Sequence, residues 1–181
     1  MRTTSRGGEK MGRVLASIGR NATSRVKVRY LEDATYPDGT SVAQVAFWQE
    51  FGTPGAMFPI PPRPTFRIMI RKHSKEWGPE LAKNLKASKY DGRTALGRMG
   101  ESIKDELVDS ILHADVAELS EVTKMLRKMR SEDPGMHMGL TAVFEAMRRV
   151  RAGDQGATGT AAKRLIDTAV MLRAPAYEVE T

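Results

Sequence analysis

The segment from residue 53 to residue 62 places the strongest restriction on how this chain folds, because four of its ten positions are proline. Proline has no amide hydrogen to donate, and it keeps the residue before it out of the helical region. The segment therefore predicts neither helix nor central strand, and it must run extended between its neighbours. Phe58 and Ile60 lie within it, and we expect these apolar side chains to pack against another part of the chain or against a neighbouring molecule.

Two helices are predicted on either side of this segment. Ser41 and Gln44 form the S-x-x-Q pattern of a capping box, so a helix is expected to start there and to end at Gly52 in a left-handed cap. A second helix is expected from Pro64, since proline is favoured at the first helical position. The stretch from Ser41 to Phe66 thus predicts a rigid corner that fixes how two elements meet.

The two ends of the chain predict strands. Residues 25–31 alternate strictly between polar and apolar, which is typical of a half-buried strand, and residues 176–180 alternate in the same way. We expect the two strands to pair and so to tie the ends of the chain together. The polar face of the first strand carries three positive charges, which indicates either contact with an acidic partner or DNA, or a solvated face that resists edge pairing.

Two helices of roughly 20 residues should form the main helical layer. The first follows Pro64 and is broken or kinked at Gly78-Pro79, and the second follows Asp91. Gly97 and Gly100 lie three apart in the second helix and predict close helix packing. The expected fold class is α+β, with a small antiparallel or mixed β-sheet packed against two long helices and a helical insertion.

The domain organisation follows from changes in composition. Residues 1–8 predict a flexible basic arm, and residues 9–115 together with 161–181 predict the core domain. Residues 116–160 predict a peripheral insertion of two short helices that ends in a flexible linker rich in Gly, Thr and Ala. The insertion contains too few large apolar residues to support a core alone.

Composition excludes several classes of protein. The chain has no cysteine, which rules out disulfides, thiolate metal sites and cysteine nucleophiles. It contains no apolar run of about 18 residues, so we expect no membrane span. Its net charge of +7 is compatible with a polyanionic partner, although excess Lys and Arg are more often simply solvated.

No arrangement of residues predicts catalysis. His73, His113 and His137 are far apart in sequence and form no metal-binding pattern, and the carboxylates at 105, 106 and 109 look like a solvated helix face. No nucleophile elbow, phosphate-binding loop or dinucleotide fingerprint occurs. We therefore expect no enzyme, no metal and no cofactor.

Basic residues on the two insertion helices are the remaining candidates for binding. Contact with phosphates needs only positive charge and reach, and no base-reading motif is present. The candidates for contact with DNA or an acidic partner are Lys124, Arg127, Lys128, Arg130, Arg148, Arg149 and Arg151.

Four segments in order resemble the tailed-bacteriophage family of neck and tail-completion proteins, which includes members similar to minor tail protein Z. They are LEDATYPDGTSVAQVAFWQEFGTP at 31–54, IPPRPTFR at 60–67, LSEVTKMLRKMRSEDP at 119–134 and KRLIDTAVMLRAPAYEV at 163–179. The chain departs from the family pattern near its end, where Ala169 replaces a glycine and Pro175 lies in a region that usually reads Asn-Ser.

The resemblance implies a structural virion protein that forms a ring at the head–tail junction, with DNA passing through the lumen. It implies a homo-oligomer of six or twelve copies, contacts with connector and tail tube proteins, synthesis in the host cytoplasm and residence in the neck or tail. The alternative is a non-specific nucleic-acid-binding protein acting in solution. Candidate subunit-interface residues are Trp48, Glu50, Phe51, Gly52, Phe58, Ile60, Pro61, Pro62, Arg63, Pro64 and Phe66.

Overall fold

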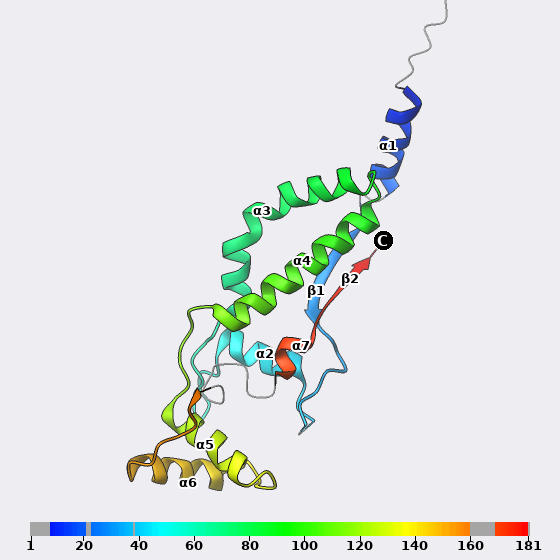
Figure 1. The fold of residues 1–181 in the computed structure, drawn as a ribbon. Helices are drawn as coiled ribbons and strands as arrows, with labels where there is room; N and C mark the ends of the chain where they lie inside the picture. The colour runs from blue at the N-terminus through cyan, green and yellow to red at the C-terminus, as the bar shows by residue number, and fades with distance from the viewer. Residues whose placement is uncertain (1–7, 21–22, 38, 160–168, 181) are drawn as a thin grey trace, which may run out of the picture.

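The computed structural model describes residues 8–20, 23–37, 39–159 and 169–180, and it shows a mixed helix and strand fold (Figure 1). The expected α+β class is confirmed. Residues 1–7 of the arm expected at 1–8 and all of residues 160–168 lie outside the described residues, while Gly8 already belongs to the first helix. The elements in order are α1 (Gly8–Arg20), β1 (Arg25–Tyr30), α2 (Val42–Phe51), α3 (Thr65–Ala87), α4 (Gly92–His113), α5 (Glu121–Glu132), α6 (Leu140–Arg151), α7 (Val170–Arg173) and β2 (Pro175–Glu180).

Strands β1 and β2 form an antiparallel ribbon, as their alternating patterns predict, with Val26 opposite Val179 and Val28 opposite Tyr177. The positive row on β1 faces glutamates on β2. Arg25 and Lys27 both bind Glu180, at 2.7 and 2.5 Å, and Arg29 binds Glu178 at 2.8 Å. The charged face of the ribbon is therefore neutralised within the chain, which favours the interpretation as a solvated face.

The apolar face of the ribbon is covered by α4, and α3 lies on α4 (Figure 1). The arrangement has three layers, so α3 packs mainly on α4 and not directly on the sheet. The core lies where α4 meets the start of α3, α2 and α7. Its buried apolar residues are Tyr30, Val42, Ala46, Met69, Leu107, Ile111, Met171 and Ala174.

A break or a kink was expected at Gly78-Pro79, and helix α3 continues through these residues without a break. Pro79 cannot donate the hydrogen bond that an interior residue normally makes, and its ring crowds the preceding turn. Proline is a common cause of helix bending, and α3 does bend along its course (Figure 1).

The glycine pair in α4 has a different role from the one expected. A Cβ built at Gly100 would lie 2.8 Å from Val26 Cγ2 and would also overlap the Tyr177 ring, whereas nothing lies within 4 Å of a Cβ at Gly97. Gly100 therefore permits close approach of α4 to the β-ribbon, and not to another helix. Gly97 serves no such packing, because its side of the helix is open.

The insertion is a pair of helices, α5 and α6, with its own small apolar cluster of Met125, Met129 and Ala146. The expected flexible linker after α6 is packed where it is described. Gly156 lies against the backbone of α5, where a Cβ would come within 2.8 Å of the Lys124 carbonyl carbon, and the Ala157 amide donates to the Lys124 carbonyl at 2.9 Å. The stretch of residues 153–159 therefore returns to α5 and packs against it.

The two glycines of α4 offer a matched test of this packing. Gly100→Ala should lower the free energy of unfolding by about 1–3 kcal/mol, because the added methyl forces Tyr177 and Val26 to move. Gly97→Ala should raise it by about 0.5–1 kcal/mol, since alanine is the better helix former and the space is free. Urea unfolding followed by circular dichroism measures both, and equal effects would contradict the close approach at Gly100.

Candidate interaction surfaces

The guanidinium of Arg63 joins three separate segments of the chain. Its side chain is buried, with 4% of its surface exposed. Nε donates to the carbonyl of Ala117 at 2.8 Å and Nη2 to the carbonyl of Glu118 at 2.9 Å, while Nη1 donates to Gln49 Oε1 at 3.1 Å. Arg63 thus ties the end of the proline-rich segment to α2 and to the stretch that leads into the insertion.

The buried carboxylate of Glu50 completes the start of α3. Proline at the N-cap position offers no side-chain acceptor, and the first amides of a helix need partners outside it. Glu50 accepts hydrogen bonds from the amides of Phe66 and Arg67, both at 3.1 Å, and from Arg67 Nε at 2.9 Å. A negative charge is also favourable at the positive end of the helix dipole.

Glycine is required at position 52 on two grounds. Its φ is +74°, a region that other residues rarely adopt, and a Cβ there would lie 2.7 Å from the Ile60 carbonyl. The ψ of −176° sends the chain out extended, so the turn differs from the expected left-handed cap. The Thr53 amide then donates to the Ile60 carbonyl at 3.1 Å and closes the loop 53–60.

The capping box expected at the start of α2 is not formed. Ser41 occupies the N-cap position, but its side chain accepts no hydrogen bond from the helix. The Ser41 carbonyl nevertheless receives the Val45 amide at 3.1 Å, so α2 begins where the pattern predicts. The start of this helix depends instead on the tertiary setting of Val42, which is completely buried in the core.

The candidate interface residues divide into three groups. Glu50, Gly52 and Arg63 are buried inside the chain, while Pro64 and Phe66 are half-buried, and the Phe66 ring contacts Tyr30 edge to face at 5.8 Å between centroids. The remaining candidates are exposed and so available to a neighbour. They are Trp48, Phe51, Phe58, Ile60, Pro61 and Pro62.

An aromatic surface covers the outer side of α2. Phe47 and Phe51, 59% and 53% exposed, lie in contact with ring centroids 4.8 Å apart and ring planes tilted by 43°. The Arg67 guanidinium lies 5.1 Å from the Phe51 centroid, a cation–π distance. An apolar groove of about 420 Å³ lies beside these rings and is also lined by Val28 and Tyr30. We name Phe47 and Phe51 with this groove the α2 surface.

A second apolar surface joins the proline-rich loop to the insertion. The Phe58 ring meets the Phe144 ring of α6 edge to face, with centroids 6.1 Å apart. Three further apolar residues of the loop and α6 are exposed beside this pair, namely Met57, Ile60 and Leu140. We name these five residues the loop surface. Phe58 therefore packs within the chain, as expected, and yet stays partly open to solvent.

Several of the basic candidates on the insertion are paired within the chain. Glu145 accepts from Arg148 at 2.7 and 2.8 Å and from Arg149 at 3.0 Å. Hydrogen bonds from Arg148 and then Arg149 lower the pKa of Glu145 to about 2, so the carboxylate stays ionised across the physiological range. Lys124 binds Glu121 at 2.8 Å, and Lys128 donates to the Gln155 carbonyl at 3.1 Å. These pairs leave the insertion less positive than its basic residues suggest.

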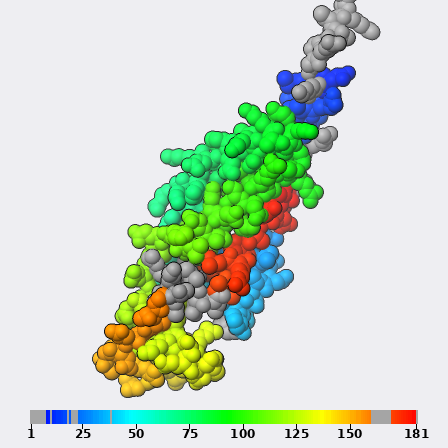
Figure 2. Space-filling view, in the orientation of Figure 1, coloured from blue at the N-terminus to red at the C-terminus, as the bar shows by residue number. Residues whose placement is uncertain are grey.

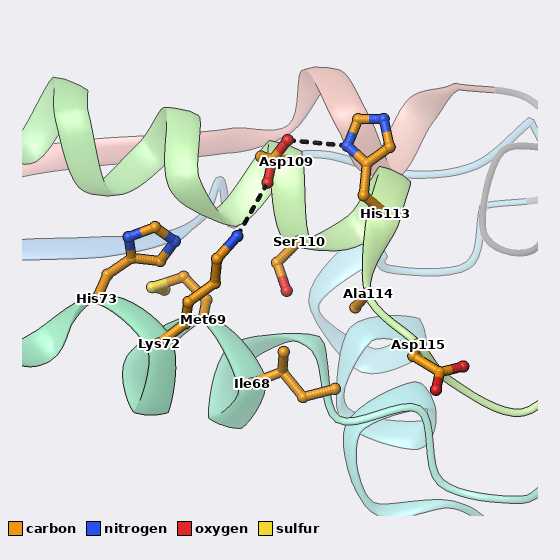
Figure 3. A pocket seen from close by; sticks show the side chains of 9 residues that line it. All are labelled: Ile68, Met69, Lys72, His73, Asp109, Ser110, His113, Ala114 and Asp115. Atoms are coloured by element: carbon orange, nitrogen blue, oxygen red, sulfur yellow. Dashed lines mark hydrogen bonds and ion pairs between the residues drawn. The ribbon is translucent and has the colours of Figure 1, made fainter.

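The groove between α3 and α4 holds charged pairs over an apolar floor (Figure 3). It has a volume of about 220 Å³, with Ile68 and Met69 among its lining residues. Asp109 lies between His113 Nδ1 at 2.8 Å and Lys72 Nζ at 3.9 Å. The Asp109 carboxylate is thus shared by His113 and Lys72, and the Ser110 hydroxyl of the same groove donates to the Thr65 carbonyl at 2.8 Å.

The acidic face expected to be solvated on α4 is partly used in packing. Glu106 accepts the indole N–H of Trp77 at 2.9 Å and lies 3.6 Å from His73 Nδ1. It therefore links α4 to α3 across the layer. Sequence spacing alone could not identify these partners, because they come from the facing helix.

Two features are absent from the described residues. No group of three or more His, Cys, Asp or Glu side chains there is placed to hold a metal ion. No helix in the same residues combines the length and the apolar character needed to cross a membrane.

Comparison with known proteins gives no match: no family model, no curated protein and no solved structure is detectably similar to this chain.

Removing the Arg63 side chain should release the insertion from the core. Arg63→Ala leaves the carbonyls of Ala117 and Glu118 without their donor, so amide exchange in residues 114–120 should rise while α4 stays protected. Hydrogen exchange read by mass spectrometry measures this. Arg71→Ala, an exposed site on α3, is the matched control and should change neither region. Unaltered exchange at 114–120 in the Arg63 variant would contradict the assignment.

Proposed function

We propose that this chain is a structural subunit of a tailed-phage virion, which assembles into a ring at the head–tail junction through which DNA passes. The proposal rests on the resemblance of four ordered segments to neck and tail-completion proteins. The observation that carries it is the exposure of the aromatic residues. All five phenylalanines lie in the part of the chain that the structure describes, and none of them is buried.

Such exposure is costly for a chain that works alone. Phenylalanine is among the residues most often fully buried, and large contiguous apolar patches on a soluble protein usually mark sites of interaction. In the described residues fifteen large apolar side chains are exposed, and fourteen apolar residues are buried. Exposed aromatic groups are the usual anchors of protein interfaces, so they support an assembly subunit.

The positions of the two apolar surfaces support a ring. A closed ring of identical subunits uses head-to-tail contacts, in which each copy contributes two different surfaces. The α2 surface and the loop surface are built from different residues and lie on different elements. Helix α1, which extends from one end of the elongated molecule, exposes Met11 and Leu15 as a third apolar stripe (Figure 2). Six or twelve copies, with connector and tail tube proteins as neighbours, form part of the proposal.

Three of the residues in the segments that carry the resemblance fix the backbone on which the exposed apolar residues lie. Glu50 holds the start of α3 in place, Gly52 permits the turn into the loop, and Arg63 anchors the end of the loop. The exposed rings of Phe51 and Phe58 are therefore held by a rigid base. Preorganised side chains lose less conformational entropy on binding, so this base favours their use in an interface.

Replacing the aromatic pair of the α2 surface should prevent assembly and leave the fold intact. A Phe47→Ser, Phe51→Ser double variant should enter purified virions at less than about a tenth of the wild-type level, because interface anchors carry most of the binding energy. Quantitative mass spectrometry of particles made by complementation measures this, and circular dichroism checks the fold.

The matched control is Ile70→Ser, an exposed apolar residue on α3 outside both surfaces. Incorporation of the double variant at the wild-type level would remove the α2 surface from the interface. Absence of the wild-type chain from purified virions would overturn the proposed function itself.

A further inference from the structure

Helix α3 carries a large part of the net positive charge of this chain. Its 23 residues carry six cationic and two carboxylate side chains, a net charge of +4 out of +7 for the whole chain. Residues 116–159, which include the basic insertion helices, carry seven cationic and six carboxylate side chains, a net charge of +1. The insertion is therefore close to neutral, although its helices are rich in Lys and Arg.

Four exposed cations of α3 form no ion pair with any residue that the structure describes, namely Arg71, Lys75, Lys83 and Lys86. Lys72 beside them reaches Asp109 only at 3.9 Å. By contrast, the cations of β1 are bound by glutamates, and Glu145 binds both Arg148 and Arg149. These other basic groups are already neutralised by carboxylates of the same chain, so they attract an external anion less strongly than the cations of α3 do.

The four cations share one side of the helix. On a straight helix of 100° per residue the four exposed cations would fall within an arc of about 120° and extend over about 22 Å, and Lys72, which reaches Asp109 of α4, would lie in the same arc. The two carboxylates of α3, Glu76 and Glu80, lie beyond one edge of this arc. Two of these cations precede Gly78-Pro79 in the sequence and two follow it, and they form a basic stripe along a helix that bends along its course (Figure 1).

We propose that this stripe on α3 is the surface that binds the sugar–phosphate backbone of duplex DNA, without sequence specificity. Phosphate contacts require positive charge and reach, which long exposed Lys and Arg side chains supply. A protein partner is less well matched, because protein interfaces have an apolar core and the stripe residues supply none. The choice of duplex DNA as the polyanion rests on the proposed function, whereas the position of the stripe does not.

Binding of the full-length chain to a fluorescent 30-base-pair duplex of random sequence tests the inference. The stripe variant is Arg71→Gln, Lys75→Gln, Lys83→Gln, Lys86→Gln, and the matched control removes the same charge from the insertion by Lys124→Gln, Arg148→Gln, Arg149→Gln, Arg151→Gln. At low salt the stripe variant should bind at least about tenfold more weakly, and the control should change affinity by less than about threefold. The slope of log K against log salt should fall by about 0.9 for each phosphate that the variant no longer neutralises.

Three outcomes would overturn the inference. The first is that the wild-type chain does not bind the duplex at low salt. The second is that the insertion variant binds DNA more weakly than the stripe variant does. The third is that the stripe variant binds DNA as the wild-type chain does, but has lost a salt-sensitive self-association that the wild-type chain shows in sedimentation. The last would assign the stripe to an acidic surface of a second copy. Circular dichroism confirms that both variants fold. The DNA-binding assay does not require a ring to assemble. A failure to bind DNA would therefore contradict the inference about α3, whereas absence of the chain from virions would contradict the proposed function.

Discussion

The buried guanidinium of Arg63 is the interaction on which the arrangement of this molecule depends. A charge taken out of water is strongly unfavourable unless it is fully hydrogen-bonded, and Arg63 reaches two backbone carbonyls and a side-chain amide. Its acceptors belong to α2 and to the stretch that leads into the insertion. Arg63 therefore links the proline-rich segment to the core and to the insertion, the contact between Phe58 and Phe144 adds a second link to the insertion, and Glu50 fixes the adjoining start of α3.

Charge pairing within the chain decides which basic surfaces remain available. The row of cations on β1 and the arginine pair on α6 are conspicuous in the sequence, yet both are opposed by glutamates at hydrogen-bond distance. Exposed ion pairs of this kind add little stability, but they do reduce the local positive potential. The less conspicuous cations of α3 keep their full charge because their face of the helix carries few acids. Net charge alone gives no information on this distribution.

The local sequence pattern predicted most helices and strands, but it could not predict contacts between residues that are far apart in the sequence. Period-two alternation identified both strands and their pairing, and the Pro and Gly positions identified the corner. The roles of Glu50 and Arg63 as internal bonds could not be read from spacing, because their partners lie 16 and 54 residues away. Phe51 was among the predicted interface residues, whereas Phe47 was missed because the apolar residues of α2 are spread around the helix and no distinct polar face marks its exposed side. Gly97 and Gly100 look equivalent in sequence, and only the position of Tyr177 separates them.

The rigid corner and the exposed aromatics are two parts of one arrangement. Aromatic rings on a mobile loop would lose conformational freedom on association, and that loss would offset much of the gain from burying them. Here Gly52 and the Thr53–Ile60 hydrogen bonds close the loop, Arg63 anchors its end, and the Phe58 ring already rests on Phe144. The polar groups of the corner are satisfied inside the chain, so they need no partner of their own. They leave an apolar surface of fixed shape, and such a surface can join identical subunits at one repeated angle.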